Sequence, residues 1–174
     1  MRFLGLSLLL MFLTLTVLAQ TPWQKYIANP TPDNAELVDE LSYDHSVGGE
    51  EQEVDVMVLE SQVFAGDRAA IFLAYRIIKK SGGSIAEDLY QSLGLLIRIN
   101  PKLFLETLQD SYNDSIDIGA LVGNLGIAFV DRPSARRYEL AARIKAIDSV
   151  HSGRLKKVRD ICHKEIENQL KQVN

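Results

Sequence analysis

The sequence predicts an all-α protein of about seven or eight helices, packed as a short irregular solenoid or bundle. Three observations predict this class. Apolar residues recur at three- and four-residue steps through most of the 174 residues. Favoured N-cap residues, such as Asp67 and Asn100, stand directly before these apolar runs. A similar stretch of sequence returns after 32 positions, within the period range of helical solenoid repeats.

The first 19 residues predict export from the cytoplasm. Arg2 precedes a long uncharged and mostly apolar run from Phe3 to Leu18, which the small residue Ala19 follows. This order is typical of a secretory signal peptide, here residues 1–19, cleaved after Ala19. The run is nearly long enough to span a membrane, so an uncleaved anchor is the alternative. No later segment has that length and character, and we therefore expect the mature chain in the periplasm or outside the cell.

The mature chain is predicted to begin with an irregular segment and to continue as one domain. Residues 20–32 hold three prolines, which favours an irregular lead-in, and a single all-helical domain is expected over residues 33–174. Asp33 is expected to cap a helix over residues 33–41. Residues 51–65 fit a helical face, although VDVMV within them alternates as a strand would. We prefer a helix there, because the neighbouring segments are helical and no partner strand is visible.

The middle of the chain contains the clearest helical signals. The residues from Ala69 to Tyr75 are all apolar, which predicts a helix buried on every side. Asn100 is expected to end the following helix and to cap the next one. Pro101 would then occupy the first helical position, where its missing N–H costs nothing. The Asn-Pro pair is therefore interpreted as a corner between two helices.

Three further helices are predicted in the C-terminal part, over residues 115–130, 133–149 and 154–172. In the first, Gly119 and Gly123 lie one turn apart, and we expect a neighbouring helix to approach closely there, with a ligand-lined groove as the alternative. The second is expected to bury four side chains: Leu140, Ala141, Ile144 and Ile147. The third carries an apolar stripe made of Leu155, Val158, Cys162, Ile166 and Leu170. The only cysteine is therefore interpreted as a buried and unreactive thiol, rather than as a link between two chains.

Two nine-residue stretches suggest an internal repeat. LGLLIRINP, residues 93–101, aligns with LGIAFVDRP, residues 125–133, through shared Leu, Gly and Pro. With its short amphipathic helices and its Asn-Pro corner, the region 84–149 resembles bacterial HEAT-like or armadillo-like α-helical repeat proteins. The resemblance implies an irregular right-handed α-α superhelix that works by binding through an exposed face. It implies no site residues.

The distribution of charge points to the C-terminal end as the candidate binding region. Residues 20–130 hold 7 Lys/Arg against 17 Asp/Glu, whereas residues 131–174 hold 11 against 6. Two sets of basic residues fall in rows on their helices: Lys157, Lys164 and Lys171 on the last helix, and Arg132, Arg136 and Arg143 on the one before. The rows predict an anionic partner. The candidates are an acidic protein, a second copy of this chain, or an anionic cell-envelope component such as lipid headgroups or a wall polymer. The alternative is that they are ordinary solvated helix faces, and nucleic acid is not expected outside the cytoplasm.

The predicted function is binding without catalysis. The sequence holds no phosphate loop, dinucleotide fingerprint, nucleophile elbow or paired-cysteine metal pattern, and we expect no cofactor, metal or catalytic residue. An inhibitor or immunity-type protein acting outside the cytoplasm is one alternative. A small metal-dependent hydrolase is the other, because the acidic loop 43–55 combines His45 with several carboxylates.

Overall fold

The computed structural model describes residues 20–38, 50–80, 83–111 and 116–173, with the backbone alone at positions 50–55 and 84. All regular structure in these ranges is helical, and the predicted all-α class is confirmed. The described residues form nine α-helices and two short 3₁₀ turns. Their bounds are α1 Pro22–Ala28, α2 Pro32–Leu37, α3 Glu50–Phe64, α4 Arg68–Ile78, α5 Gly83–Ile99, α6 Pro101–Ser111, α7 Ile118–Gly123, η1 Ile127–Phe129, α8 Pro133–Asp148, η2 Gly153–Leu155 and α9 Lys156–Gln172.

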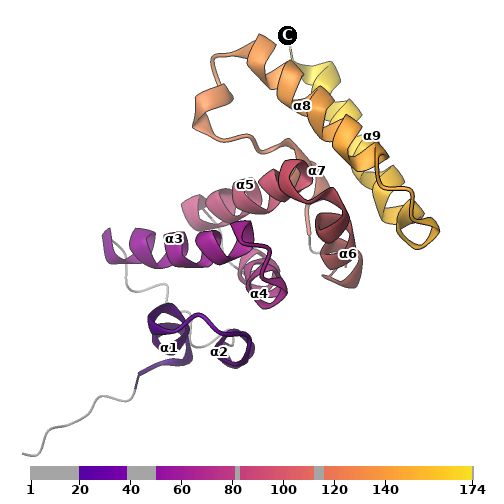
Figure 1. Ribbon diagram of the computed structural model, residues 1–174. Coiled ribbons are helices and arrows are strands. Elements are labelled where there is room, and N and C mark those ends of the chain that lie inside the picture. The colour runs from indigo at the N-terminus through magenta and orange to yellow at the C-terminus, as the bar shows by residue number, and fades with distance from the viewer. Residues whose placement is uncertain (1–19, 39–49, 81–82, 112–115, 174) are drawn as a thin grey trace, which may run out of the picture.

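The helices follow one another through space in roughly the order of the sequence (Figure 1). Helices α1 and α2 lie at one end, α3 to α6 form the middle, and the antiparallel pair α8–α9 lies at the other end. The short helix α7 packs against both α5 and α9, so it joins the middle of the molecule to the C-terminal pair. One continuous set of buried apolar side chains runs through all of these helices.

Helix α4 occupies the centre, as its all-round apolar sequence predicts. It packs against α2, α3, α5 and α6, and seven of its eleven residues are buried. Its N-cap is Asp67, whose Oδ1 accepts a hydrogen bond from the amide of Ala70 at 2.8 Å. An isolated apolar helix of this kind would expose its surface on every side, so α4 depends on the four helices that cover it.

The predicted irregular lead-in over residues 20–32 is corrected by the structure, because it contains helix α1. Thr21 and Gln24 form a capping box: the Thr21 Oγ1 accepts from the Gln24 amide at 3.1 Å, and the Gln24 Oε1 accepts from the Thr21 amide at 3.0 Å. Pro22 occupies the first turn, where a proline is tolerated. Trp23 and Tyr26 are buried in the common core, so this segment belongs to the folded body.

Helix α2 also departs from its predicted bounds of 33–41. Its N-cap is Thr31, whose Oγ1 accepts from the Asn34 amide at 3.3 Å, and Pro32 takes the first helical position. The predicted cap Asp33 is therefore already inside the helix. Two of the three prolines that suggested irregular structure, Pro22 and Pro32, are placed at helix starts, where their fixed φ angle is favourable, and Pro30 lies between the two helices.

The corner at Asn100 and Pro101 is confirmed. Helix α5 ends at Ile99 and α6 starts at Pro101, so no linker other than Asn100 separates them. The Asn100 Oδ1 accepts from the Leu103 amide at 3.1 Å, which is the bond expected of an N-cap. The backbone amide of Asn100 still donates to the carbonyl of Leu96, at 2.7 Å, and this residue therefore closes one helix and opens the next.

The helix predicted over residues 115–130 is wrong in its second half. Helix α7 ends at Gly123, and Gly126 takes a φ of +81°, a left-handed conformation that glycine adopts without steric cost. The Asn124 Oδ1 accepts from the Gly126 amide at 3.0 Å, which favours a turn over a continued helix. The turn leads into η1, where Ile127 and Val130 are exposed and Phe129 packs against the core.

The two stretches that suggest a repeat have different conformations in their first parts. Leu93 to Ile99 belongs to helix α5, whereas Leu125 to Val130 forms the turn and η1. They agree at their ends, where Pro101 and Pro133 each start a helix. The repeat relation between them stays a prediction.

Candidate functional site

Helix α8 packs on the body of the protein through the face that carries its arginines. The sequence predicted a buried side made of Leu140, Ala141, Ile144 and Ile147, but Ala141 is exposed and Ile144 is only half-buried. The buried residues are Leu140, Arg143 and Ile147. The buried face is thus rotated around the helix toward the arginines, and Arg143 does not lie on an exposed basic row.

The buried guanidinium of Arg143 is held by the C-terminal end of α7 and by a carboxylate. Its Nη1 donates to the carbonyl oxygens of Val122 at 2.8 Å and of Asn124 at 3.4 Å. Its Nε donates to Glu139 at 3.3 Å, and Glu139 also accepts from Arg98 at 2.9 Å. Burial lowers the pKa of Arg143, whereas the charge of Glu139 opposes this change. Arg143 therefore joins α7 to α8, and its charge is already used within the fold.

The three lysines of the last helix lie where the sequence predicted them. Lys157, Lys164 and Lys171 are exposed on α9, on the side opposite the buried Val158, Cys162 and Ile166. None of the three makes an ion pair with a described residue. We call these three residues the lysine row. Its exposure is confirmed, and its role in binding stays a prediction.

The remaining two arginines of the predicted row lie near the start of α8. Arg132 is exposed, and Arg136 is half-buried with its Nη2 donating to Gln169 at 3.4 Å. Arg136 also lines a depression on the described surface. The six predicted residues consequently divide into an outward row on α9, an exposed Arg132 at the N-cap of α8, a buried Arg143, and Arg136 at the depression.

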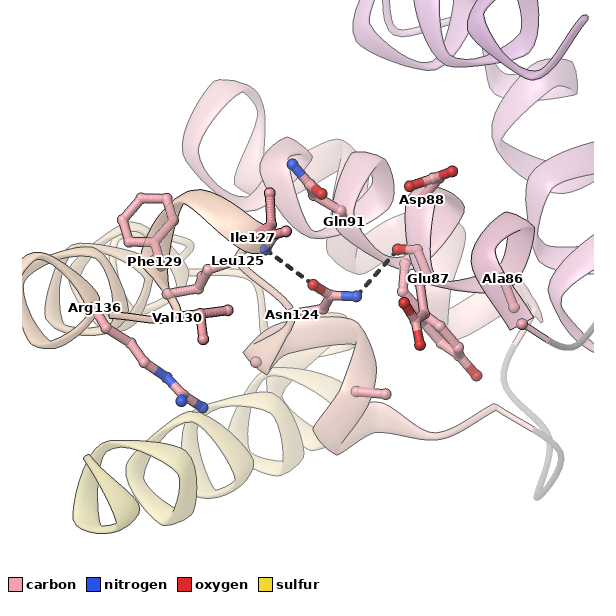
Figure 2. A pocket seen from close by; sticks show the side chains of 15 residues that line it. Ala86, Glu87, Asp88, Gln91, Asn124, Leu125, Ile127, Phe129, Val130 and Arg136 are labelled. Atoms are coloured by element: carbon pink, nitrogen blue, oxygen red, sulfur yellow. Dashed lines mark hydrogen bonds between the residues drawn. The ribbon is translucent and has the colours of Figure 1, made fainter. Parts of the chain in front are cut away.

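The depression is a groove of about 860 Å³ between α5 and the segment after α7 (Figure 2). Known small-ligand pockets have volumes of roughly 300–1,000 Å³, so the groove is large enough to hold several side chains of a partner. One wall is the first half of α5, and the other is the turn and η1, residues 124–130. Asn124 ties the walls together, because its Nδ2 donates to the carbonyl oxygen of Glu87 at 3.1 Å. We refer to this site as the groove.

The wall formed by residues 125–130 carries apolar side chains. Leu125 is buried and Phe129 is partly buried against the core, which fixes the wall to the body of the protein. Ile127 is 92% exposed and Val130 is 69% exposed. Single exposed apolar residues are common on protein surfaces. Two of them within four residues, at the edge of a groove, form the kind of patch that marks an interaction site.

The two ends of the groove differ in charge. In Figure 2 Arg136 lies at one end, and Glu87 and Asp88 lie at the other, with the apolar wall between them. Arg136 and Glu87 form no ion pair with a described residue. The charge carried by each is therefore available to a molecule in the groove.

Sequence reasoning missed the groove because it assigned residues 115–130 to one helix. A continuous helix lacks the turn and η1, which form one wall of the groove. The available signal was the Asn124–Gly126 pair, since asparagine and glycine two residues apart favour a turn. The predicted close approach at Gly123 is confirmed: a Cβ added there would lie 2.7 Å from the Gln169 side chain of α9.

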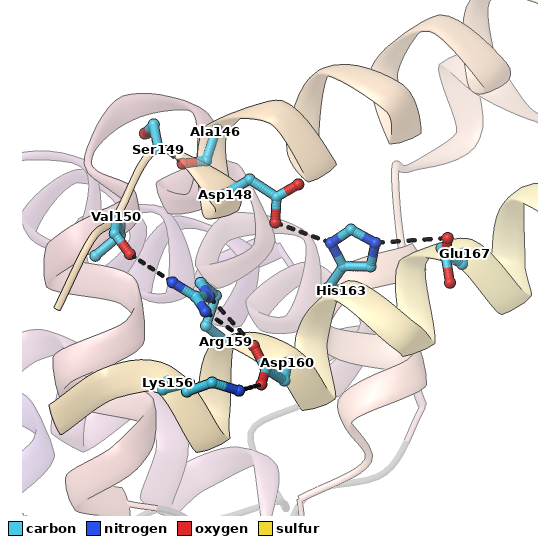
Figure 3. Close-up of polar contacts among 9 residues, drawn as sticks. All are labelled: Ala146, Asp148, Ser149, Val150, Lys156, Arg159, Asp160, His163 and Glu167. Carbon is cyan, nitrogen blue, oxygen red and sulfur yellow. Dashed lines mark hydrogen bonds and ion pairs between the residues drawn. The ribbon is translucent and has the colours of Figure 1, made fainter. Parts of the chain in front are cut away.

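A second polar cluster links α8 to α9 far from the groove (Figure 3). The His163 Nδ1 lies 2.9 Å from an Asp148 carboxylate oxygen, and its Nε2 lies 3.5 Å from Glu167. One turn away on α9, Asp160 accepts from both Lys156 and Arg159. Across the described ranges, no three His, Cys, Asp or Glu residues are arranged to hold a metal ion.

Two sequence predictions fall outside what the structure describes. His45 and the rest of the acidic loop up to residue 49 are not among the described residues, and neither is the predicted signal peptide at 1–19. Among the helices that are described, none combines the length and the apolar character that crossing a membrane requires.

Comparisons with known proteins give no relative. The chain matches no family model, no characterised protein and no solved structure.

Proposed function

We propose that this chain is exported and acts outside the cytoplasm as a binding protein without catalytic activity, whose groove receives a segment of a partner protein. The leader pattern of residues 1–19 supports the location. The groove supports the binding role, because it offers an apolar wall with a charged group at each end. An inhibitor or immunity-type protein is a special case of this function, in which the partner is an enzyme that the groove occupies.

One observation carries the proposal: Ile127 and Val130 stand 92% and 69% exposed at the edge of the groove. Full burial of one such side chain contributes about 1.5–3 kcal/mol. A partner that covers both residues would therefore gain a large part of the energy of a specific complex. Phe129 and Leu125 anchor the same wall to the core, so little ordering is needed when the partner binds.

The proposal is tested by photo-crosslinking in the cell that makes the protein. A photoreactive amino acid replaces Ile127 in one variant and Met57 in a matched control, since Met57 is 63% exposed on α3 and does not line the groove. We expect a defined crosslinked product at position 127 in the extracytoplasmic fraction and none at position 57. Equal products at both positions, or none at position 127, would exclude the groove as the binding site.

A second crosslinking experiment, with substitutions of exposed apolar residues, checks that the apolar side chains of the groove cause the binding. Val130→Asp, combined with the photoreactive group at position 127, should remove the crosslinked product. Leu37→Asp, at a residue of α2 that is 59% exposed, should leave it unchanged. Both variants should keep the thermal melt of the parent protein, because neither residue is buried.

A second candidate surface is the lysine row. Its three charges are exposed and make no ion pair with a described residue, which favours contact with an anionic cell-envelope component. This contact is compatible with occupation of the groove, and its test is given in the Discussion.

A further inference from the structure

We infer that the groove selects a peptide segment with opposite charges on the two sides of an apolar centre, with a carboxylate beside Arg136 and a basic side chain beside Glu87. The inference rests on the proposed function, since it names the chemistry of the partner segment. Three features of the groove support it: a positive end, a negative end and a fixed distance between them.

The positive end is Arg136. Its guanidinium is half-buried and meets a neutral group, the Gln169 side chain, at 3.4 Å. No carboxylate of a described residue lies within ion-pair distance of it. Arg132, one turn earlier on the same helix, is exposed and adds to the positive potential. Partly buried arginine is well suited to bind a carboxylate, because its planar donors match the two oxygens.

The negative end is Glu87 on α5. Its side chain is exposed and lines the groove, and it makes no ion pair with a described residue. Asp88 follows it and also lines the groove. A basic side chain of a partner is the group that this end attracts.

The distance between the two ends is set by the fold. Asn124 holds the turn against α5 through Glu87, and Gln169 and Arg136 hold the start of α8 against α9. A Cβ added to Gly126 would lie 2.5 Å from Gln91 of α5, so the turn and α5 are in close contact. Both charges are thus carried on packed helices, and the apolar side chains of Ile127 and Val130 lie between them (Figure 2).

A peptide fits this arrangement better than a single-headed amphiphile does. A fatty acid has one charged group. If its carboxylate bound Arg136, its hydrocarbon end would lie beside Glu87. In the opposite direction, its carboxylate would lie away from Arg136. A peptide segment supplies an apolar centre and two different charged side chains at once. It can run in either direction along the groove, so the order of its two charges along the chain is not determined.

The test uses three synthetic peptides with acetylated and amidated ends. Each has the same apolar centre, Leu-Phe-Leu, flanked by Lys and Glu, by two Lys or by two Glu. Binding to the full exported protein is measured by fluorescence anisotropy at low salt. We expect the Lys/Glu peptide to bind about two- to five-fold more tightly than either of the others, the range that exposed ion pairs give.

Charge-reversal variants make the test specific. In Arg136→Glu, the Lys/Lys peptide should bind most tightly of the three. In Glu87→Lys, the Glu/Glu peptide should bind most tightly. Lys145→Glu and Glu36→Lys are matched controls, because both residues are exposed and lie outside the groove. The controls should keep the preference of the wild type, and a thermal melt verifies that every variant is folded.

Four results would overturn the inference, and they separate it from the proposed function. If the three peptides bind equally and Val130→Asp weakens them all, charge selection is wrong although the groove still binds. If no peptide binds, both the charge selection and the proposed binding role of the groove are wrong for peptide partners. If dodecanoate displaces the peptides at lower concentration than they bind, the occupant is an amphiphile. If sedimentation equilibrium shows a dimer that Val130→Asp dissociates, the occupant is a second copy of this chain.

Discussion

Arg143 joins α7 to α8 through a buried guanidinium. Its side chain is completely buried, yet it is bonded to Glu139 and to two backbone carbonyls. Gly94 of α5 is needed to make room for it, because a Cβ there would lie 2.9 Å from the Arg143 Nη1. A buried charge is tolerated when it is paired and hydrogen-bonded, and removing one partner leaves the others uncompensated.

Replacing Arg143 is therefore expected to destabilise the fold strongly. Arg143→Met fills a similar volume but leaves the Val122 and Asn124 carbonyls without their donor. We expect a loss of about 3–5 kcal/mol in the free energy of unfolding, measured by urea titration. Arg132→Met is the matched control, because Arg132 is exposed at the N-cap of the same helix and makes no side-chain cap bond, and it should change stability by less than about 0.5 kcal/mol. Equal effects of the two variants would contradict the buried role.

Cys162 is expected to be unreactive in the folded protein. It is completely buried on α9, and burial raises its pKa to about 12, with a smaller contribution from Glu165. The reactive thiolate is therefore scarce at neutral pH and is out of reach of solvent. A thiol reagent should label the protein only after denaturant is added. Rapid labelling in native buffer, or a dimer that a reducing agent dissociates, would show that the thiol is accessible.

Five of the described helices begin at a side-chain cap, whereas α8 and α9 begin without one. Thr21, Thr31, Asp67, Asn100 and Asp117 each accept a hydrogen bond from the amide three residues later. Such caps satisfy one of the amides that a helix start leaves without a partner. They act over one turn, so they determine where a helix begins whatever the helix later packs against.

The corner between α5 and α6 provides a test of this local control. Asn100→Ala removes the acceptor for the Leu103 amide and should cost about 0.5–2 kcal/mol. Pro101→Ala keeps every hydrogen bond of the corner and should cost less than Asn100→Ala, because the proline mainly restricts the unfolded chain. Thermal melts of the two variants compare these effects. A larger loss for Pro101→Ala would mean that the cap is not what holds the corner.

The pairing of α8 with α9 is expected to depend on pH through His163. The hydrogen bond to Asp148, together with Glu167, raises the pKa of His163 above its ordinary value, although partial desolvation opposes the change. A raised pKa in the folded state means that the charged ring stabilises the fold. This contribution is fully present below the unfolded pKa of about 6.5 and is lost as pH rises through the raised value.

His163→Gln should therefore lower stability at pH 5 by less than about 1 kcal/mol and leave it unchanged at pH 9. Urea titrations at the two pH values measure the difference. His151→Gln is the control, since His151 is exposed and has no carboxylate partner among the described residues. If the free energies of unfolding of wild type and His163→Gln differ by the same amount at both pH values, the ion pairs of His163 are excluded as the cause of the difference.

At the scale of the whole molecule, charge is segregated along the chain. Residues 20–130 have a net charge of −10 and residues 131–174 a net charge of +5. The lysine row is an exposed part of that positive segment, at the end of the molecule opposite α1 and α2 (Figure 1). Charges act over about 8 Å at physiological salt, so the row matters only to a partner that comes into contact with it.

Reversing Lys157, Lys164 and Lys171 to Glu is expected to abolish binding to vesicles that contain anionic phospholipid. The fold should be unaffected, because the three residues face away from the core, and added salt should weaken wild-type binding in the same way. The matched control reverses Lys25, Lys102 and Lys145, three exposed lysines on other helices. Cosedimentation with vesicles measures both variants. If the two variants bind alike, only net charge is recognised, and if wild type does not bind, the row is a solvated face.

The sequence by itself determined the class of fold and most of its helices. The central place of α4, the corner at Asn100 and the burial of Cys162 are all as predicted. These features depend on periodicity and on caps, and both are encoded within a few consecutive residues. The exposure of the lysine row is also encoded locally, because the row lies directly opposite an apolar stripe on one helix.

Only the tertiary structure decided which face of α8 is buried and where the groove lies. Two faces of α8 were nearly equivalent in sequence, one richer in aliphatic residues and one carrying the arginines. The second is buried because Arg143 finds partners on α7, about twenty residues away in the chain, and Glu139 shares its charge with Arg98 of α5. Such partners are not visible in a local pattern. The groove depends on the same distant contacts, since Asn124 must meet α5 before its two walls exist.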